Sequence, residues 1–184
     1  MPHRAAGRVV IAIDGPAASG KSSTAHWVAK RLEFNHVDSG ALYRAITAAA
    51  VRRSSDAETW TEEFVLAGGR SIALVHDGQS FAPTIDGQRV DDEIRCADVT
   101  KHVSRVARMM PVRDWVNDQV RSTAGSFDIV VDGRDMGTAV FPAAQLKVFL
   151  VADPWERARR RLVQSIGRSP NDAEIAEETD RLVR

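Results

Sequence analysis

The chain of 184 residues has little of what marks secreted, membrane-spanning or nucleic-acid-binding proteins. Its single cysteine, Cys96, excludes an intrachain disulfide and a zinc site built from several cysteines. The 25 lysines and arginines equal the 25 aspartates and glutamates, so the chain lacks the positive excess typical of a dedicated nucleic-acid binder. Its longest nearly apolar stretch, residues 45–51, is far shorter than the roughly 20 residues that cross a bilayer.

The amino-terminal residues Met1 to Arg8 lack the apolar segment and the small-residue cleavage site of a signal peptide. We therefore expect a cytoplasmic protein that has neither a membrane nor a nucleic acid as its partner. The content of 43% hydrophobic and 27% charged residues is typical of a globular chain and excludes wholesale disorder. A chain of this size predicts one domain, or a core domain that carries a small insertion.

Short continuous apolar runs alternate with segments of helical spacing. The runs are Val9–Ile13, Ile129–Val131 and Val148–Ala152. Such runs are typical of strands that are buried on both faces. Apolar positions three and four residues apart predict helices over residues 25–32, 99–110 and 111–120, the last of them opened by Pro111. The alternation predicts an α/β fold, with a parallel sheet flanked by helices.

The middle of the chain follows a different pattern. Short β-like runs are separated by the turn signals Asp77-Gly78 and Asp86-Gly87, which predicts a small antiparallel insertion over about residues 70–95. The runs are Ser71–Val75, Ala82–Asp86 and Gln88–Val90. Near the end, Ser169-Pro170-Asn171-Asp172 predicts an N-cap at Ser169 and a helix that continues to about Arg184.

Residues 15–22 fit the pattern G-x-x-x-x-G-K-[ST] and lie between a predicted strand and a predicted helix, which is the context of a P-loop. Glycines let the backbone wrap a phosphate with its N–H groups inward, and the helix presents its positive end. A chance glycine-rich turn is the alternative, which a shuffled chain would give roughly once in several hundred sequences. The expected ATP contacts are Gly15, Pro16, Ala17, Ala18, Ser19, Gly20, Lys21, Ser22 and Ser23.

Asp132 ends the apolar run at residues 129–131, where its carboxylate could lie beside the P-loop. In P-loop proteins a hydroxyl such as that of Ser22 and a strand-end carboxylate hold Mg²⁺. We therefore predict Ser22 and Asp132 as the metal site. The alternative is that Asp132 serves only the turn that follows the strand.

Three longer blocks, Ile13–Pro16, Asp38–Arg44 and Asp132–Pro142, together resemble bacterial cytidylate kinases, which are P-loop nucleoside-monophosphate kinases. Further matches follow in the same order at residues 86–95 and 156–161, so that the resemblance covers nearly the whole chain. It implies transfer of the γ-phosphoryl group of ATP to CMP or dCMP with Mg²⁺. It also implies a five-stranded parallel sheet, a mobile lid and a protein that is typically a monomer.

The resemblance divides the chain into a core, residues 8–40 and 126–165, an NMP-binding region with the β insertion, residues 41–125, and a partial lid, residues 166–184. It implies that Arg44 and Arg134 hold the acceptor phosphate and that they are catalytic residues together with Lys21. Ser104, Arg113 and Asp135 match the residues that recognise cytosine, and Ser39 lines the acceptor side. Arginine suits a phosphate because its planar fork donates two hydrogen bonds and keeps its charge.

Each of these residues also has an ordinary structural interpretation. Arg44 and Arg113 could face solvent on helices, Ser104 could be a plain helix residue, and Asp135 could cap a turn. Arg157 and Arg161 belong to a cationic stretch that is either a solvated helix face or, as in the family, a source of arginines that approach ATP.

Members of the family normally continue past the position matched by Arg184, with lid arginines, a last strand and a helix. Either the sequence omits such a tail or the protein is short. Two rival functions stay open beside cytidylate kinase activity. One is a P-loop kinase for another small acceptor, and the other is a nucleotide-binding protein that is inactive because it lacks the lid and the carboxyl terminus.

Overall fold

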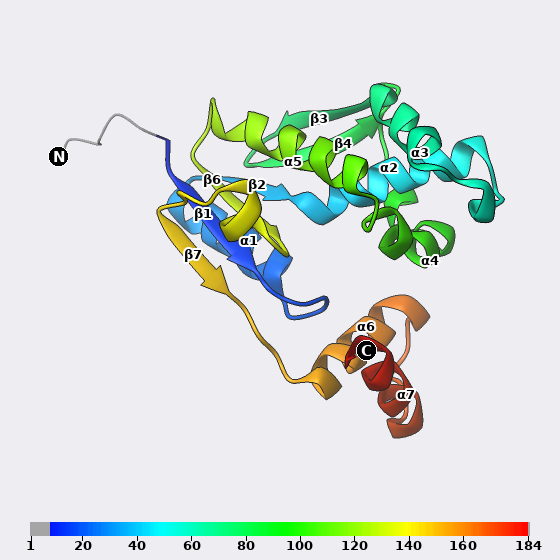
Figure 1. Ribbon diagram of the computed structural model, residues 1–184. Helices are drawn as coiled ribbons and strands as arrows, with labels where there is room; N and C mark the ends of the chain where they lie inside the picture. Colours follow the sequence, from blue (N-terminus) through cyan, green and yellow to red (C-terminus); the bar gives the residue numbers. More distant parts are fainter. Residues whose placement is uncertain (1–7, 184) are drawn as a thin grey trace.

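The computed structural model describes residues 8–183, which form a seven-stranded sheet with helices on both faces (Figure 1). The expectations for Met1 to Gly7 and for Arg184 lie outside these residues. The strands are β1 (Val10–Asp14), β2 (Asn35–Asp38), β3 (Ile72–Asp77), β4 (Ser80–Ile85), β5 (Gln88–Arg89), β6 (Ile129–Gly133) and β7 (Leu146–Phe149). The helices are α1 (Lys21–Leu32), α2 (Ser39–Arg53), α3 (Glu62–Gly68), α4 (Ala97–Val106), α5 (Met110–Ala124), α6 (Pro154–Ile166) and α7 (Asp172–Val183).

The strand order is β3-β4-β2-β6-β1-β7, with β5 paired to β4. The strands from β4 to β7 in this order are mutually parallel, five in all, as the resemblance implies. The predicted antiparallel strands are confirmed, because β3 and β5 both run antiparallel to β4. However, β4 also pairs with β2, so the antiparallel hairpin extends the main sheet at its edge.

The predicted strand over Val148–Ala152 is wrong at its second half. The observed strand, β7, begins two residues earlier and ends at Phe149. Its only partner within residues 8–183 is β1, which makes it an edge strand. No strand of residues 8–183 covers its outer edge, and Leu146 and Phe149 are exposed. Val151, which lies beyond the end of the strand, is exposed as well.

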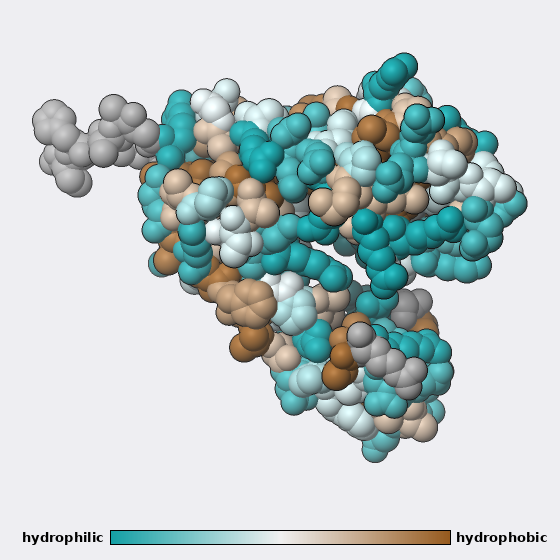
Figure 2. Space-filling model, viewed as in Figure 1, coloured by the Kyte–Doolittle hydropathy of each residue, from teal (hydrophilic) through white to brown (hydrophobic). Residues whose placement is uncertain are grey.

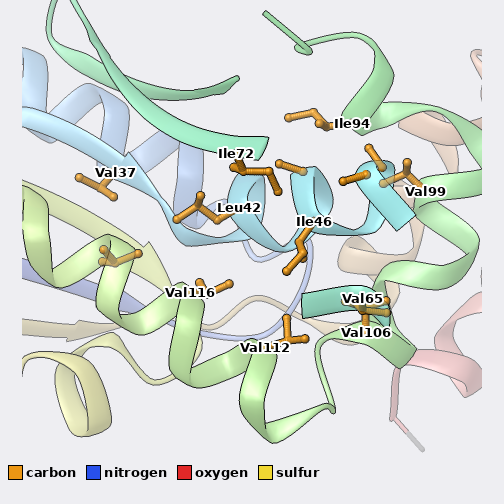
Figure 3. Close-up of a cluster of buried hydrophobic side chains, with 14 of the residues drawn as sticks. Val37, Leu42, Ile46, Val65, Ile72, Ile94, Val99, Val106, Val112 and Val116 are labelled. Carbon is orange, nitrogen blue, oxygen red and sulfur yellow. The ribbon is translucent and has the colours of Figure 1, made fainter. Parts of the chain in front are cut away.

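Successive residues of the central strands point into two different cores. Val10 and Ala12 pack against α2 and α5, whereas Ile11 and Ile13 pack against α1 on the other face. The larger core surrounds α2, whose residues 45–50 are all buried, and Figure 3 shows Leu42 and Ile46 of this helix among the valines of α4 and α5. The apolar stretch noted in the sequence is therefore the inner helix of a globular fold. None of the helices within residues 8–183 has the length and apolar character to cross a membrane.

Helices α6 and α7 pack against each other and stand apart from the other helices, joined to β7 by an extended segment (Figure 1). The predicted helix near the end is confirmed, but its N-cap is Asn171 and not Ser169. Asn171 Oδ1 accepts a hydrogen bond from the Glu174 amide at 3.0 Å, and the Glu174 carboxylate accepts one from the Asn171 amide at 2.8 Å. This reciprocal capping box satisfies two amides, which the Ser169 alternative would leave without partners.

Candidate active site

A cavity of about 1000 Å³ opens at the carboxyl ends of β1, β2 and β6 and reaches across to α6. Ligands of open α/β sheets bind at this edge, because the loops and helix starts gather there. Figure 2 shows hydrophilic residues around the hollow that separates the sheet from the α6–α7 pair. The lining contains every predicted site residue except Gly15 and Pro16: Ala17, Ala18, Ser19, Gly20, Lys21, Ser22, Ser23, Ser39, Arg44, Ser104, Arg113, Asp132, Arg134 and Asp135.

The loop between β1 and α1 is shaped by positive φ angles. Gly15 has a φ of 152°, and Gly20 has a φ of 96°. A Cβ atom at Gly15 would lie 2.2 Å from the backbone oxygen of Leu150, so no larger residue fits without moving the backbone. The loop is therefore wound tightly at the start of α1, as a backbone cradle for an anion requires.

Lys21, the first residue of α1, reaches back over this loop. Its Nζ atom donates a hydrogen bond to the Pro16 carbonyl at 2.7 Å. Partial burial lowers the pKa of the Lys21 ammonium, and the nearby Asp132 carboxylate opposes this shift. The ammonium is thus held at the mouth of the loop, beside the position that the motif assigns to a phosphate.

The two predicted metal ligands are in direct contact. Ser22 Oγ donates a hydrogen bond to Asp132 Oδ2 at 2.7 Å. A hydroxyl and a carboxylate supply the hard oxygen ligands that Mg²⁺ prefers, so these residues fit the ion that the motif implies. No group of three or more His, Cys, Asp or Glu side chains within residues 8–183 is arranged to hold a metal. Magnesium at this place would therefore need water and phosphate oxygens as its other ligands.

His36 is a contact of Asp132 that the sequence did not reveal. Its Nε2 atom lies 2.7 Å from Asp132 Oδ1, and both side chains are buried. The strands β2 and β6 bring them together, with His36 opposite Val130 and Asp38 opposite Asp132. With Ser22 on one oxygen and His36 on the other, the Asp132 carboxylate is held in a single orientation.

Asp38 and Ser39 form the junction between β2 and α2. Asp38 caps α2, because its Oδ1 atom accepts a hydrogen bond from the Ala41 amide at 3.2 Å. Burial and the neighbouring Asp132 raise the pKa of Asp38, while His36 opposes the shift. Ser39 Oγ donates to the Asp132 carbonyl at 2.8 Å, which joins the start of α2 to the end of β6.

The predicted acceptor residues come from α2, α4, α5 and the segment after β6. Arg113 of α5 forms an ion pair with Asp135 and also donates to the Ala107 carbonyl at 3.3 Å. Arg44 of α2 donates to the Ile94 carbonyl at 3.2 Å and to Thr100 Oγ1 at 3.0 Å. The fold therefore brings residues from distant parts of the sequence to one wall of the cavity.

Helix α6 supplies the opposite wall, but not with Arg157 or Arg161, for which the sequence left open a solvated helix face or an approach to ATP. Arg160 and Gln164 line the cavity, whereas Arg161 is bound to Glu178 of α7 at 3.1 Å. Arg157 is buried, and its Nη1 atom donates to the Ala17 carbonyl of the loop at 3.4 Å. Sequence reasoning also gave no role to Arg95 and Arg108, which line the cavity. Arg95 is the last residue of the matched block at residues 86–95, whereas no matched block contains Arg108.

Comparisons with known proteins show the family of the chain. The sequence model of a family described as Cytidylate kinase matches residues 11–182. The cytidylate kinase of Chloroherpeton thalassium is 39% identical over 165 residues, which are 89% of this chain and 69% of that protein. That of Pelodictyon phaeoclathratiforme is 40% identical over 169 residues, 91% of this chain and 72% of that protein. That of Geobacillus thermodenitrificans is 42% identical over 172 residues, 93% of this chain and 77% of that protein.

Among solved structures, TT1252 from Thermus thermophilus covers 95% of this chain and 80% of its own, with a TM-score of 0.46 and 16% identity. This likeness is too distant to bear on the function. The sequence relatives are longer than this chain, which spans about seven tenths of the length of the first two.

Proposed function

Because the chain belongs to the cytidylate kinase family, we propose that it transfers the γ-phosphoryl group of ATP to CMP or dCMP and gives CDP or dCDP. The observation that carries the proposal is a single cavity lined both by the P-loop and by Arg44, Arg113, Arg134 and Asp135. One wall suits a triphosphate and the other suits a nucleoside monophosphate. A phosphotransferase needs the two within reach of each other.

On the donor side, the amides of residues 15–23 would surround the phosphates of ATP, and Lys21 would exchange its Pro16 partner for phosphate oxygens. Ser22 and Asp132 would hold Mg²⁺, which neutralises charge on the phosphates when it is bound. His36 keeps the Asp132 carboxylate turned toward Ser22. The main contribution of these residues would be to align the substrates and compensate charge, because phosphoryl transfer requires almost no covalent participation of protein side chains.

On the acceptor side, Arg44 and Arg134 would hold the phosphate of CMP, with Ser39 at the same wall. Asp135 can accept a hydrogen bond from the exocyclic amine of cytosine, and Arg113 and Ser104 can donate to the ring nitrogen and the carbonyl. Uracil has a carbonyl in place of that amine. A site built to accept a hydrogen bond there discriminates against uracil, because the half-buried carboxylate would then face a second acceptor in place of a donor.

The same proposal assigns residues 8–40 and 126–165 to the core, residues 41–125 to the NMP-binding region and residues 166–184 to part of the lid. We also propose that the protein is a cytoplasmic monomer, and light scattering on the purified chain tests the oligomeric state.

A panel assay tests the function. ADP release from ATP and Mg²⁺ is measured with CMP, dCMP, UMP, AMP or GMP as the acceptor. We expect CMP and dCMP to give the highest kcat/KM. A preference for UMP or for another small acceptor would favour a different P-loop kinase. Binding of ATP in calorimetry without CMP-dependent release of ADP would favour a nucleotide-binding protein that lacks catalysis.

A further inference from the structure

Asp14 is a buried carboxylate that has no place in the proposed reaction. It is the last residue of β1, is 7% exposed and does not line the cavity. Its two oxygens each accept one backbone hydrogen bond, from the Met136 amide at 2.8 Å and from the Gly137 amide at 2.8 Å. These amides are 122 and 123 residues away in the sequence. Both oxygens of this buried carboxylate thus accept charge-assisted hydrogen bonds from a distant segment, which joins the end of β1 to the residues after β6.

The two amides open a single π-helical turn, η4 (Met136–Val140), which follows Arg134 and Asp135 directly. The first amides of a helical turn have no partner within the turn. Buried amides without partners are costly, so the Asp14 carboxylate decides where this turn can begin. The position of the turn then decides where the two preceding residues, Arg134 and Asp135, lie.

The segment before the turn is also fixed. Gly133 ends β6 opposite Asp14 in the sheet. A Cβ atom at Gly133 would lie 2.6 Å from Met136 Cγ and 2.7 Å from Ser39 Oγ, which shows how closely the segment is packed. Arg134 and Asp135 therefore lie between two fixed residues. Gly133 is held in the sheet, and the Met136 amide is bonded to the Asp14 carboxylate.

Asp14 also belongs to the donor side. Gly15, the next residue, begins the P-loop, and the Asp14 carbonyl accepts a hydrogen bond from the Leu150 amide at 2.7 Å. The backbone of Asp14 thus leads into the ATP cradle while its side chain holds the segment of the acceptor residues. One residue joins the two halves of the site through contacts that are short and buried.

We infer that Asp14 is a positioning residue, which sets the place of Arg134 and Asp135 relative to the P-loop and thereby tunes affinity and selectivity for the acceptor nucleotide. This inference rests on the proposed function. Asp14 does not line the cavity, so we expect its effect on the reaction to pass through residues 133–137.

The variant Asp14→Asn tests the inference with almost no change in volume. The amide side chain retains one acceptor oxygen, but its NH₂ group meets a second N–H donor, so one of the two bonds is lost. We expect KM for CMP to rise about tenfold and the preference for CMP over UMP to fall by a similar factor, as the loss of one charge-assisted hydrogen bond predicts. KM for ATP should change by less than about twofold, because the P-loop backbone keeps its own contacts.

Asp128→Asn is the matched control. Asp128 lies just before β6, and its Oδ1 atom accepts a hydrogen bond from the Val9 amide at 2.8 Å, at the opposite end of β1 from Asp14. This variant should lower the melting temperature and leave both KM values and the CMP-to-UMP preference unchanged. If Asp14→Asn behaves in the same way, its carboxylate is only structural and the inference is wrong. An equal rise in KM for ATP and for CMP would likewise overturn it.

Gly137→Ala approaches the same contact from the other side. The added Cβ would lie 3.2 Å from Asp14 Oδ2, so the carboxylate or the turn must shift by a few tenths of an ångström. We expect the same direction of change as for Asp14→Asn, but smaller, and a double variant that is less than additive. Additive effects would contradict a shared contact, and this variant also serves if Asp14→Asn does not fold.

Amide hydrogen exchange separates the inference from the proposed function. In Asp14→Asn, we expect amide exchange at Met136 and Gly137 to be about tenfold faster than in the wild type, or more. The increase at the amides of β6 should be smaller. Unchanged exchange would overturn the anchoring. A wild-type protein that phosphorylates no CMP would overturn the proposed function, while the exchange measurement would still report on the anchor.

Discussion

The two sides of the proposed active site are built in different ways. The donor side is one continuous segment, residues 15–23, whose backbone conformation depends on glycines and whose amides we propose to surround the phosphates of ATP. The acceptor side consists of side chains from four separate elements, among them Arg44 of α2, Arg113 of α5 and Asp135 after β6. A site made of local backbone depends on a few conformations. A site made of distant side chains depends on the whole fold, and it can vary in specificity while the donor side stays the same.

The cations of the two sides also have different partners. Lys21 is hydrogen-bonded to a carbonyl of its own loop, only five residues away. Arg113 and Arg44 are bonded to groups of other elements, namely Asp135, Ile94 and Thr100. A change on the donor side should therefore affect turnover with every acceptor, whereas a change on the acceptor side should affect the choice of acceptor.

The largest expected effect is that of Lys21→Ala on the donor side. In the proposed reaction the Lys21 ammonium contacts the transferred phosphoryl group. We expect its loss to lower kcat by about a thousandfold, the order found when one preorganised charge stabiliser is removed. The measurement is ADP release with saturating ATP and CMP. Lys30→Ala, on the exposed last turn of α1, is the control. Normal turnover of Lys21→Ala would remove the ammonium from the mechanism.

Gly15→Ala should abolish the shape of the cradle. The Cβ atom would be placed 2.2 Å from the Leu150 oxygen at a φ of 152°, so the loop must open. We expect the affinity for ATP to fall by about a hundredfold, since the phosphates then lose several amide donors. Calorimetric titration with ATP measures this. Gly78→Ala, at a φ of 62° in an open turn with no atom within 4 Å of the added Cβ, controls for backbone strain alone. Equal affinities in both variants would show that the cradle tolerates the change.

Asp135→Ala tests the acceptor side. Loss of the carboxylate removes the acceptor for the cytosine amine and leaves Arg113 without its ion-pair partner. We expect the ratio of kcat/KM for CMP to that for UMP to fall by about ten- to a hundredfold, which corresponds to one or two lost hydrogen bonds. Asp118→Ala, an exposed carboxylate of α5 that pairs with Arg121, is the control. An unchanged ratio would show that Asp135 does not recognise the base.

The smallest expected effect concerns stability and the junction between the two sides. Because burial and Asp132 raise the pKa of Asp38 above its ordinary value of 3.8, the folded protein binds this proton more tightly than the unfolded chain does. That stabilisation is present at low pH and is lost as the pH rises through the raised pKa. Asp38→Asn keeps an oxygen to cap α2 and carries no charge. Its melting temperature should therefore exceed that of the wild type by a margin that grows with pH. The margin should reach about 2–4 °C near neutrality, which corresponds to ~1 kcal/mol in the free energy of unfolding.

The measurement for Asp38→Asn is thermal unfolding between about pH 4 and 8, the interval in which a raised carboxyl pKa takes effect. Asp56→Asn is the control, because Asp56 caps the turn Ala57–Thr59 on the surface, where its side chain accepts from the Glu58 amide at 3.1 Å. A difference between Asp38→Asn and the wild type that stays constant with pH would contradict the raised pKa.

The same division explains what could be predicted from the sequence. The P-loop, the strands β1 and β6 and most helices follow from local patterns, because one segment contains both the signal and the structure. The ion pair of Arg113 with Asp135, the contact of His36 with Asp132 and the two bonds of Asp14 depend on strand register and loop placement. No local pattern records these. The early end of β7 has the same origin, since its exposure depends on which strands lie beside it.

Helix α2 has a consequence for how this protein can diverge. Half of its buried residues are alanines, at positions 45, 48, 49 and 50, and Gly68 of α3 lies so close that a Cβ there would be 3.1 Å from the Ala49 methyl. Arg44 belongs to the same helix. A larger side chain in place of one of these alanines would shift α2 sideways and move the Arg44 guanidinium with it. Mutational drift should therefore be slowest along this helix, although most of its residues never meet a nucleotide.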